Sequence, residues 1–303
     1  MSRAQPGIFG EGTSAHLHLE WSVHADVSDH DLRGALCAAL GLAEETVTVG
    51  GVNSVLGFGA NLWTRLSSVR PAQLAAFADV GVAPRHAPAT QRDVWLWIHG
   101  SSPDVVFDNG KDASRALRSI ADLQLEQFGF RYRDSRDITG FIDGTENPAT
   151  WDALDVALIP DGEDGANGSY AMTQRWIHDL NRFHALPVEE QEKVFGRTKP
   201  DSIEMGDDTK PASAHIARVV IEEDGEELEI YRRSTPYFGM AEHGLYFVAF
   251  AAERRRFELM LARMFGTSGD GNHDHLTDFT RPVSGSFWFV PSLDDLLVAI
   301  EPR

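Results

Sequence analysis

The sequence predicts an α+β fold in which helices pack against antiparallel sheet. Two observations lead to this fold class. Short segments in which apolar and polar residues alternate, as in half-buried strands, recur between helical segments along the chain of 303 residues. Several of these segments are separated by stretches rich in Gly, Asp and Asn, which is typical of hairpins. A doubly wound parallel sheet fits this pattern less well.

Length and composition limit the class of protein. The chain is long enough for one large domain or two of ordinary size, and 42% hydrophobic residues are enough for a core. Acidic residues outnumber basic residues by 46 to 27, which gives a formal net charge of −19. This excess argues against binding to nucleic acid or to an anionic membrane, because both depend on Lys and Arg that neutralise phosphate.

The cysteine content and the N-terminal residues bear on the compartment. The single cysteine, Cys37, cannot form an intrachain disulfide, and a reducing compartment is compatible with this. Residues 1–12 contain no apolar signal core and no twin-arginine pair. No run approaches the roughly 20 apolar residues that a transmembrane helix needs. We therefore expect a soluble cytoplasmic protein that does not insert into a membrane.

The first half of the chain begins with a strand and a helix. Residues 16–23 alternate as in a half-buried strand, with His16, His18 and Glu20 on one face. Two histidines at this spacing could bind a metal, but we interpret the face as solvated. A helix capped by Ser28 is expected to continue to about Leu42, because leucines recur in it at helical spacing.

A glycine-rich stretch and a strongly apolar strand come next. Residues 46–66 contain four glycines but no Gly-Lys-Ser/Thr sequence, so we interpret the stretch as structural and not as a phosphate-binding loop. Residues 93–99 predict a strand in which Trp95 and Trp97 belong to the core. The other elements expected here are a short helix at 73–78, a helix at 113–124 and a strand at 129–133.

The second half repeats this kind of inventory. A loop rich in Gly, Asp and Asn is expected at 160–168. The expected helices are at 172–183, 188–195, 253–265 and 273–280. The expected strands are at 215–222, 228–233, 244–251 and 284–290, the first two forming a hairpin around the turn at 223–226. Two related α+β folds are therefore plausible, although no repeat of residues is visible.

The stretch Gly-Phe-Ile-Asp-Gly-Thr-Glu-Asn-Pro, residues 140–148, predicts a stiff turn around an acid. Gly144 permits backbone angles that a Cβ would forbid, and Pro148 restricts both itself and Asn147. Asp143 would therefore be held in one place against apolar neighbours. Poor solvation opens the pKa of such a carboxyl to tuning, which suits proton transfer. The alternative from composition alone is an ordinary surface turn.

This stretch resembles the GxxDG signature of the dye-decolourising (DyP-type) haem peroxidases, and the compact chain looks like their bacterial class B branch. The resemblance covers nearly the whole chain, up to the Arg-Pro-Val-Ser-Gly segment that begins at Arg281. It implies two ferredoxin-like halves, residues 1–135 and 136–303, with antiparallel sheets and peripheral helices. It also implies that the second half binds haem b (iron protoporphyrin IX).

The resemblance assigns roles to single residues. His215, which the sequence alone would suggest is a core histidine at a loop-to-strand junction, matches the axial ligand of the haem iron. Asp143 and Arg232 match the residues on the peroxide side of the haem, whereas Arg233 is interpreted as a surface residue. Ser234 falls where some relatives carry Asn. The expected haem contacts are Gly144 and Thr145 of the signature and Arg218, for which a solvated strand face is an equal alternative.

An axial histidine normally donates its other N–H to a carboxylate or carbonyl. Asp274 and Asp278 lie in the region where the family has a proximal acid, and the sequence does not decide between them. Because they are four residues apart on one helix face, they could not both serve equally. A metal site made by His273 and His275 is disfavoured, since histidines two apart on a helix point in different directions.

The resemblance implies that hydrogen peroxide is reduced at haem and that the resulting ferryl species oxidises a donor one electron at a time. Dyes, phenols, porphyrinogens and Mn(II) are all possible donors, and seven tryptophans and five tyrosines could carry electrons. We expect a homo-oligomer. The tail that stops at Arg303 argues against loading into an encapsulin shell, because some relatives use a long extension for it. Two alternatives are a haem carrier or iron-release protein without turnover, and an α+β oligomerisation domain without a cofactor.

Overall fold

The computed structural model describes residues 3–41, 51–149 and 151–302 of the chain. The strand-like residues 46–50 and the expected helix end at Leu42 lie outside the described residues. The first half has the order β-α-β-β-α-β. Its sheet has the order β6-β1-β5-β2, and all of these pairs are antiparallel. The elements are β1 (Ala15–Val23), α1 (Asp29–Ala39), β2 (Val52–Phe58), β5 (Val94–Gly100), α3 (Pro103–Leu117) and β6 (Ala121–Phe130).

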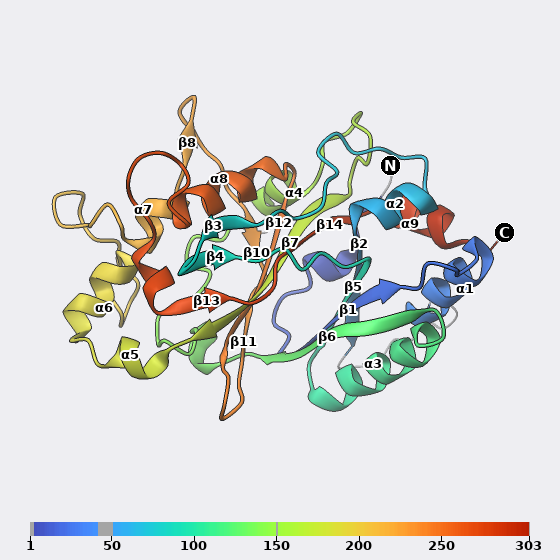
Figure 1. Cartoon of the computed structure of the whole chain (residues 1–303), viewed down its shortest axis with the longest axis horizontal. Helices are drawn as coiled ribbons and strands as arrows, with labels where there is room; N and C mark the ends of the chain where they lie inside the picture. The colour runs from blue at the N-terminus through green and yellow to red at the C-terminus, as the bar shows by residue number, and fades with distance from the viewer. Residues whose placement is uncertain (1–2, 42–50, 150, 303) are drawn as a thin grey trace.

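The second half follows the same plan with longer insertions. Its sheet has the order β10-β12-β7-β14, and the helices α5, α6 and α7 are inserted after β7 at the end of the molecule opposite α1 and α3 (Figure 1). The elements are β7 (Ser169–His178), α5 (Leu180–His184), α6 (Val188–Phe195), α7 (His215–Val219), β10 (Tyr231–Arg232), β12 (Gly244–Ala251), α8 (Arg255–Met264) and β14 (Ser286–Val290).

Shorter elements complete the fold. They are η1 (Pro6–Ile8), α2 (Ala60–Leu66), β3 (Val80–Val82), β4 (Arg85–Ala87), η2 (Arg133–Ser135), α4 (Asp152–Ala157), β8 (Glu222–Glu223), β9 (Glu226–Glu227), β11 (Thr235–Tyr237), η3 (His275–Asp278), β13 (Thr280–Pro282) and α9 (Leu293–Ile300). Among the described helices, none combines the length and the apolar character that crossing a membrane requires.

The two halves share one curved sheet. β14 pairs with β2 where Phe289 lies opposite Phe58, so the strand order runs without a break from one half to the other. At the other ends, β6 lies against β11, and a Cβ at Gly129 would come within 2.3 Å of the Thr235 hydroxyl oxygen. The sheet therefore has an outer face and an enclosed inner face. The predicted α+β fold with two ferredoxin-like halves is confirmed, while the boundary at residue 135 stays a prediction.

The period of two along each strand separates two cores. Leu17, Leu19 and Trp21 of β1 join the larger core, which contains residues of α1, α3, α8 and α9. On β5, Val94, Leu96 and Ile98 join the same core. Trp95 and Trp97, which alternate with them, point to the inner face and join an aromatic core there. The prediction that both tryptophans are buried is confirmed. The inner core also includes Ala153, Val156 and Ala157 of α4.

The solvated face predicted for β1 is wrong. His16, His18 and Glu20 point into the enclosed side and are 5%, 0% and 1% exposed. Sequence alternation shows which residues share a face, but it does not show which face a second layer will cover. No group of histidines, cysteines and carboxylates in the described part of the chain could hold a metal ion.

Several predicted elements are confirmed and others are wrong. The strands at 16–23, 93–99, 244–251 and 284–290 and the helices at 188–195 and 253–265 are present, and Ser28 caps α1. Residues 172–183 form most of β7 followed by α5, because a strand buried on both faces has the continuous apolar character of a helix. Residues 113–124 contain the end of α3 and the start of β6, and only the first two residues of the predicted strand at 129–133 belong to β6. The predicted strand at 215–222 is instead mainly α7, so its predicted hairpin with 228–233 is wrong. Only the short strands β8 and β9 pair across the turn, and β10 pairs with β12.

Another wrong element is the short helix at 73–78, where only a turn is present. Tertiary hydrogen bonds hold this segment open: the backbone N–H of Gln73 donates to the Tyr170 hydroxyl (2.9 Å), and the N–H of Phe77 donates to the side chain of Gln91 (2.9 Å). Such bonds satisfy backbone groups without helical pairing.

We predict that Gly244→Ala lowers the free energy of unfolding by about 2–3 kcal/mol. A Cβ at this position would lie 2.0 Å from the backbone oxygen of Trp176 on the paired strand β7, so the ladder must shift. Gly206→Ala is the matched control, because nothing lies within 4 Å of its Cβ, and it should change stability by about 0.5 kcal/mol or less. Equal losses in chemical denaturation would contradict the prediction.

Candidate active site

The loop that carries Asp143 is a tight turn, as its sequence predicts. Gly144 has φ +77°, a left-handed conformation that glycine adopts without strain, and the N–H of Asn147 donates to the Gly144 carbonyl (3.1 Å). The N–H of Asp143 donates to the Ser135 carbonyl (3.1 Å). These backbone bonds fix the direction of the Asp143 side chain.

Asn147 joins this loop to the second half of the sheet. Its side chain accepts the N–H of Arg232 (2.9 Å) and donates to the Arg232 carbonyl (2.7 Å), so it pairs with both backbone groups of one residue. Sequence reasoning treated Asn147 only as the end of the turn. The Asn-Pro pair was the available signal, because an amide next to a rigid residue is well placed to bind a neighbouring backbone.

Asp143 and Arg232 line one cavity of about 540 Å³. Gly144 and Ser234 also line it, and the backbone N–H of Val248 donates to the Ser234 hydroxyl oxygen (3.3 Å). The buried Nε of Arg232 has no hydrogen-bond partner among the described residues. Other lining residues are Glu11, Thr13, His16, Tyr132, Arg131, Asn147 and Arg233.

Thr145 lies apart from this cavity. The Thr145 side chain is exposed, and its hydroxyl contacts the Ser202 hydroxyl (3.0 Å). The predicted haem contact of Thr145 thus stays a prediction. Arg233, which we interpreted as a surface residue, is half-buried: its guanidinium donates to the Gly10 carbonyl (2.7 Å) and lies 5.2 Å from the Trp97 ring centre. That interpretation is wrong, because residues 8–10 cover the strand end.

Burial raises the pKa of Asp143 above its usual range. The positive charge of Arg232 opposes this rise, and the negative charge of Asp137 adds to it. A carboxyl in this state is a stronger base than a solvated aspartate.

His215 lies at the first position of α7, and its imidazole is held by a buried acid. Nδ1 of His215 is 2.6 Å from Oδ2 of Asp274, whose side chain is fully buried. The other oxygen of Asp274 accepts the N–H of Leu276 (2.9 Å), which caps η3. The second ring nitrogen, Nε2 of His215, has no partner among the described residues.

The structure thus pairs Asp274, and not Asp278, with His215. Asp278 instead accepts two hydrogen bonds from the guanidinium of Arg85 (2.7 and 3.1 Å). The two acids do not share a helix face as the sequence suggested. Asp274 precedes η3 and points inward from its N-cap, whereas Asp278 ends this short helix.

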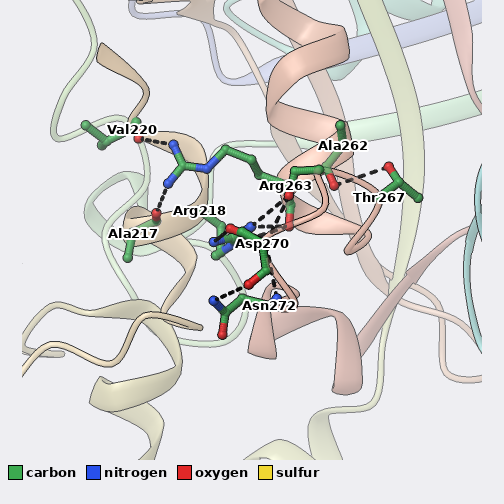
Figure 2. A network of polar contacts seen from close by, with 9 residues as sticks. Ala217, Arg218, Val220, Ala262, Arg263, Thr267, Asp270 and Asn272 are labelled. Atoms are coloured by element: carbon green, nitrogen blue, oxygen red, sulfur yellow. Dashed lines mark hydrogen bonds and ion pairs between the residues drawn. The ribbon is translucent and has the colours of Figure 1, made fainter. Parts of the chain in front are cut away.

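Arg218 ties α7 to the loop that leads to Asp274. Its side chain is 3% exposed and pairs with Asp270 (2.7 Å), while two of its nitrogens donate to the Arg263 carbonyl (3.0 and 3.1 Å) (Figure 2). In return, the Arg263 guanidinium donates to the carbonyls of Ala217 (2.7 Å) and Val220 (2.8 Å) at the end of α7. The helix that carries His215 is therefore fixed to α8 from both sides.

The solvated strand face considered for Arg218 is wrong, because Arg218 lies on a helix that packs against α8. Its contact with a haem propionate stays a prediction, and the guanidinium is already engaged by Asp270 and the Arg263 carbonyl. Hydrogen bonds from Arg218 hold the pKa of Asp270 well below its usual range.

We predict that Arg218→Leu lowers the free energy of unfolding by roughly 2–4 kcal/mol, because it removes a buried ion pair with Asp270 and both hydrogen bonds to the Arg263 carbonyl. The control is Arg115→Leu, which removes an exposed pair with Asp112 (3.1 Å) and should cost about 0.5 kcal/mol or less. Chemical denaturation compares the two. A loss for Arg218→Leu no larger than the control would show that the network does not hold α7.

Comparison with known proteins identifies the family. The family models "Dyp-type peroxidase, N-terminal" and "Dyp-type peroxidase, C-terminal" match residues 5–131 and 134–295. The dye-decolorizing peroxidase of Rhodococcus erythropolis is 40% identical over 255 residues, which cover 82% of this chain and 75% of the relative.

Solved structures agree with this match. A dye-decolorizing protein from Vibrio cholerae superimposes with a TM-score of 0.90 at 36% identity, covering 98% of this chain and 99% of the other. A DypB variant of Rhodococcus jostii, solved in complex with heme, superimposes with a TM-score of 0.87 at 36% identity, covering 94% of this chain and 95% of the other. A DypB variant has also been solved with manganese. The chain belongs to the Dyp-type peroxidase family.

Proposed function

We propose that this haem-dependent peroxidase binds the haem iron through His215 and uses Asp143 and Arg232 to assist peroxide cleavage. The observation that carries the proposal is the 2.6 Å contact between His215 and the buried Asp274. A neutral imidazole that donates Nδ1–H to a carboxylate keeps Nε2 as a basic, oriented ligand. On the other side, Arg232 has an unpartnered buried nitrogen and Asp143 lines the cavity. This donor set fits haem.

When bound, haem would supply an iron centre that hydrogen peroxide oxidises by two electrons and that a donor then reduces one electron at a time. The carboxylate of Asp143 takes a proton from one peroxide oxygen and returns it to the other. The raised pKa of Asp143 favours this role, because a stronger base takes the proton more readily. The guanidinium of Arg232 stabilises the negative charge that develops on the departing oxygen. Asn147 keeps the two residues on adjoining walls of the cavity.

We expect His215→Ala to lose haem, since no other ligand is positioned by Asp274. Arg232→Leu should keep haem but react with peroxide about 10²–10³-fold more slowly, because a charge-stabilising donor is lost. Optical titration with haem and stopped-flow mixing with peroxide measure the two effects. Haem that stays bound with unchanged affinity in His215→Ala would overturn the ligand assignment.

Two matched variants test whether these effects are specific. His243→Ala removes a half-buried histidine near the β11–β12 turn and should leave haem binding unchanged. Arg131→Leu removes another arginine from the cavity wall and should change the peroxide reaction little. If Arg131→Leu slows the reaction as much as Arg232→Leu does, the effect is one of general charge and not of Arg232 itself.

The pH dependence follows from the direction of the Asp143 shift. Asp143 accepts a proton only when it is ionised, so the reaction with peroxide should slow as the pH falls through its pKa. Because that pKa is raised, the decline should begin above the pH expected from an ordinary aspartate pKa of about 3.9. Asp143→Asn should lower the rate about 10²–10⁴-fold and remove this limb. A limb that is unchanged in Asp143→Asn would assign it to another group.

For the physiological setting, we propose an aromatic or porphyrin-type donor, with the cytoplasm as the compartment and a homo-oligomer as the working form. The cavity size and polar lining are compatible with such donors. Exposed Phe238 and Met240 near the β11–β12 turn support association between chains. Mn(II) is the second candidate donor because of the manganese complex of the Rhodococcus jostii relative, although the described residues contain no ready-made metal cluster.

A further inference from the structure

The enclosed face of the sheet contains a buried acid that the peroxide reaction does not use. Glu20 is 1% exposed, and the positive charge of Arg92 acts on it without forming an ion pair among the described residues. Its carboxylate accepts hydrogen bonds from the hydroxyls of Tyr246 (2.7 Å) and Thr173 (3.3 Å). Burying a carboxylate without a direct ion pair is costly, so apolar residues would fill this place at lower cost if packing were its only role.

Tyr246 is equally buried and is held by this acid. It is 0% exposed, and its ring stacks on His18 with centroids 4.1 Å apart. Neither ring nitrogen of His18 has a partner among the described residues. Burial raises the pKa of Glu20 to about 7, which makes its carboxylate a stronger base than an exposed one, and raises the pKa of Tyr246. The phenolic hydrogen therefore has a basic acceptor at hydrogen-bond distance.

Stacked rings connect Tyr246 to the cavity that contains Asp143 and Arg232. His16 lines this cavity. The centroids of the His16 and Trp97 rings lie 5.9 Å apart, and the indole N–H of Trp97 donates to Nδ1 of His16 (3.3 Å). The centroids of Trp97 and His18 lie 5.7 Å apart, and His18 stacks on Tyr246. All four rings belong to the inner face of β1, β5 and β12, where no donor molecule from solvent can reach the phenol.

We propose that Tyr246 and Glu20 form a buried redox site that takes one oxidising equivalent from the peroxide-oxidised haem. One electron leaves the phenol ring of Tyr246 for the haem, and the phenolic proton moves to Oε1 of Glu20. When a donor bound at the haem returns the electron through the stacked rings, Glu20 returns the proton. The site rests on the proposed haem position beside the cavity and adds to it a place where an oxidising equivalent is held out of reach of solvent.

Electron paramagnetic resonance tests this site without measuring activity. The haem-loaded protein is mixed with hydrogen peroxide in the absence of a donor and frozen rapidly, and its optical spectrum is recorded beside the radical signal. We expect a tyrosyl radical whose spectrum narrows when ring-deuterated tyrosine is incorporated. It should also couple to an exchangeable deuteron in D₂O, because protonated Glu20 remains hydrogen-bonded to the phenoxyl oxygen.

Three variants locate the radical. Tyr246→Phe should lose the signal, and Glu20→Gln should lose most of it because an amide cannot take the proton. Tyr237→Phe is the matched control and should keep the signal: Tyr237 is also buried, but its hydroxyl donates to a backbone carbonyl, that of Trp176 (2.9 Å), which is not a base.

The outcomes separate this inference from the proposed function. An optical spectrum that does not change with peroxide overturns the proposed function and this site with it. A changed spectrum overturns this site alone when the radical persists in Tyr246→Phe, arises from tryptophan, or shows no exchangeable deuteron. The last two measurements use the unmodified protein, so they decide the matter even if the variants fold poorly.

Discussion

Closure of one sheet across both halves is the constraint on which the rest of this structure depends. The pairing of β14 with β2 makes the two halves continuous, and the contact between Gly129 of β6 and Thr235 of β11 brings the opposite ends together. Any side chain larger than hydrogen at Gly129 would meet the Thr235 hydroxyl. This closure encloses the inner face, where polar groups lose contact with water and acquire shifted pKa values.

The same closure positions the cavity. Arg232 lies in β10, and the chain continues from it to Thr235 in β11. Asn147 joins the Asp143 loop to this segment, because its side chain pairs with the backbone of Arg232. A backbone clamp leaves the guanidinium unconstrained by the loop, so its charge is available to a ligand. The acid and the cation are thus held near each other without an ion pair between them among the described contacts.

The segment that carries His215 depends on an independent set of polar contacts. α7 is only five residues long and would not be stable alone, since isolated short helices are marginal. Arg218 and Arg263 exchange hydrogen bonds with backbone carbonyls of each other's segments, and this exchange orients the helix. The loop from Asp270 then returns the chain to Asp274, which meets the first residue of the helix, His215.

The sequence by itself determined the strongly alternating strands, the amphipathic helices and the turn at Gly144, because local periodicity and the residues of the loop carry that information. It also gave Asp143, His215 and Arg232 as site candidates, through the resemblance to the family. Tertiary structure decided that Asp274 supports His215, that residues 215–219 are helical and that Glu20 is buried. Each of these depends on which distant segment covers a residue, and spacing along the chain does not encode that. Alternation along a strand distinguishes its two faces, but only the packing of a second layer determines which face is buried.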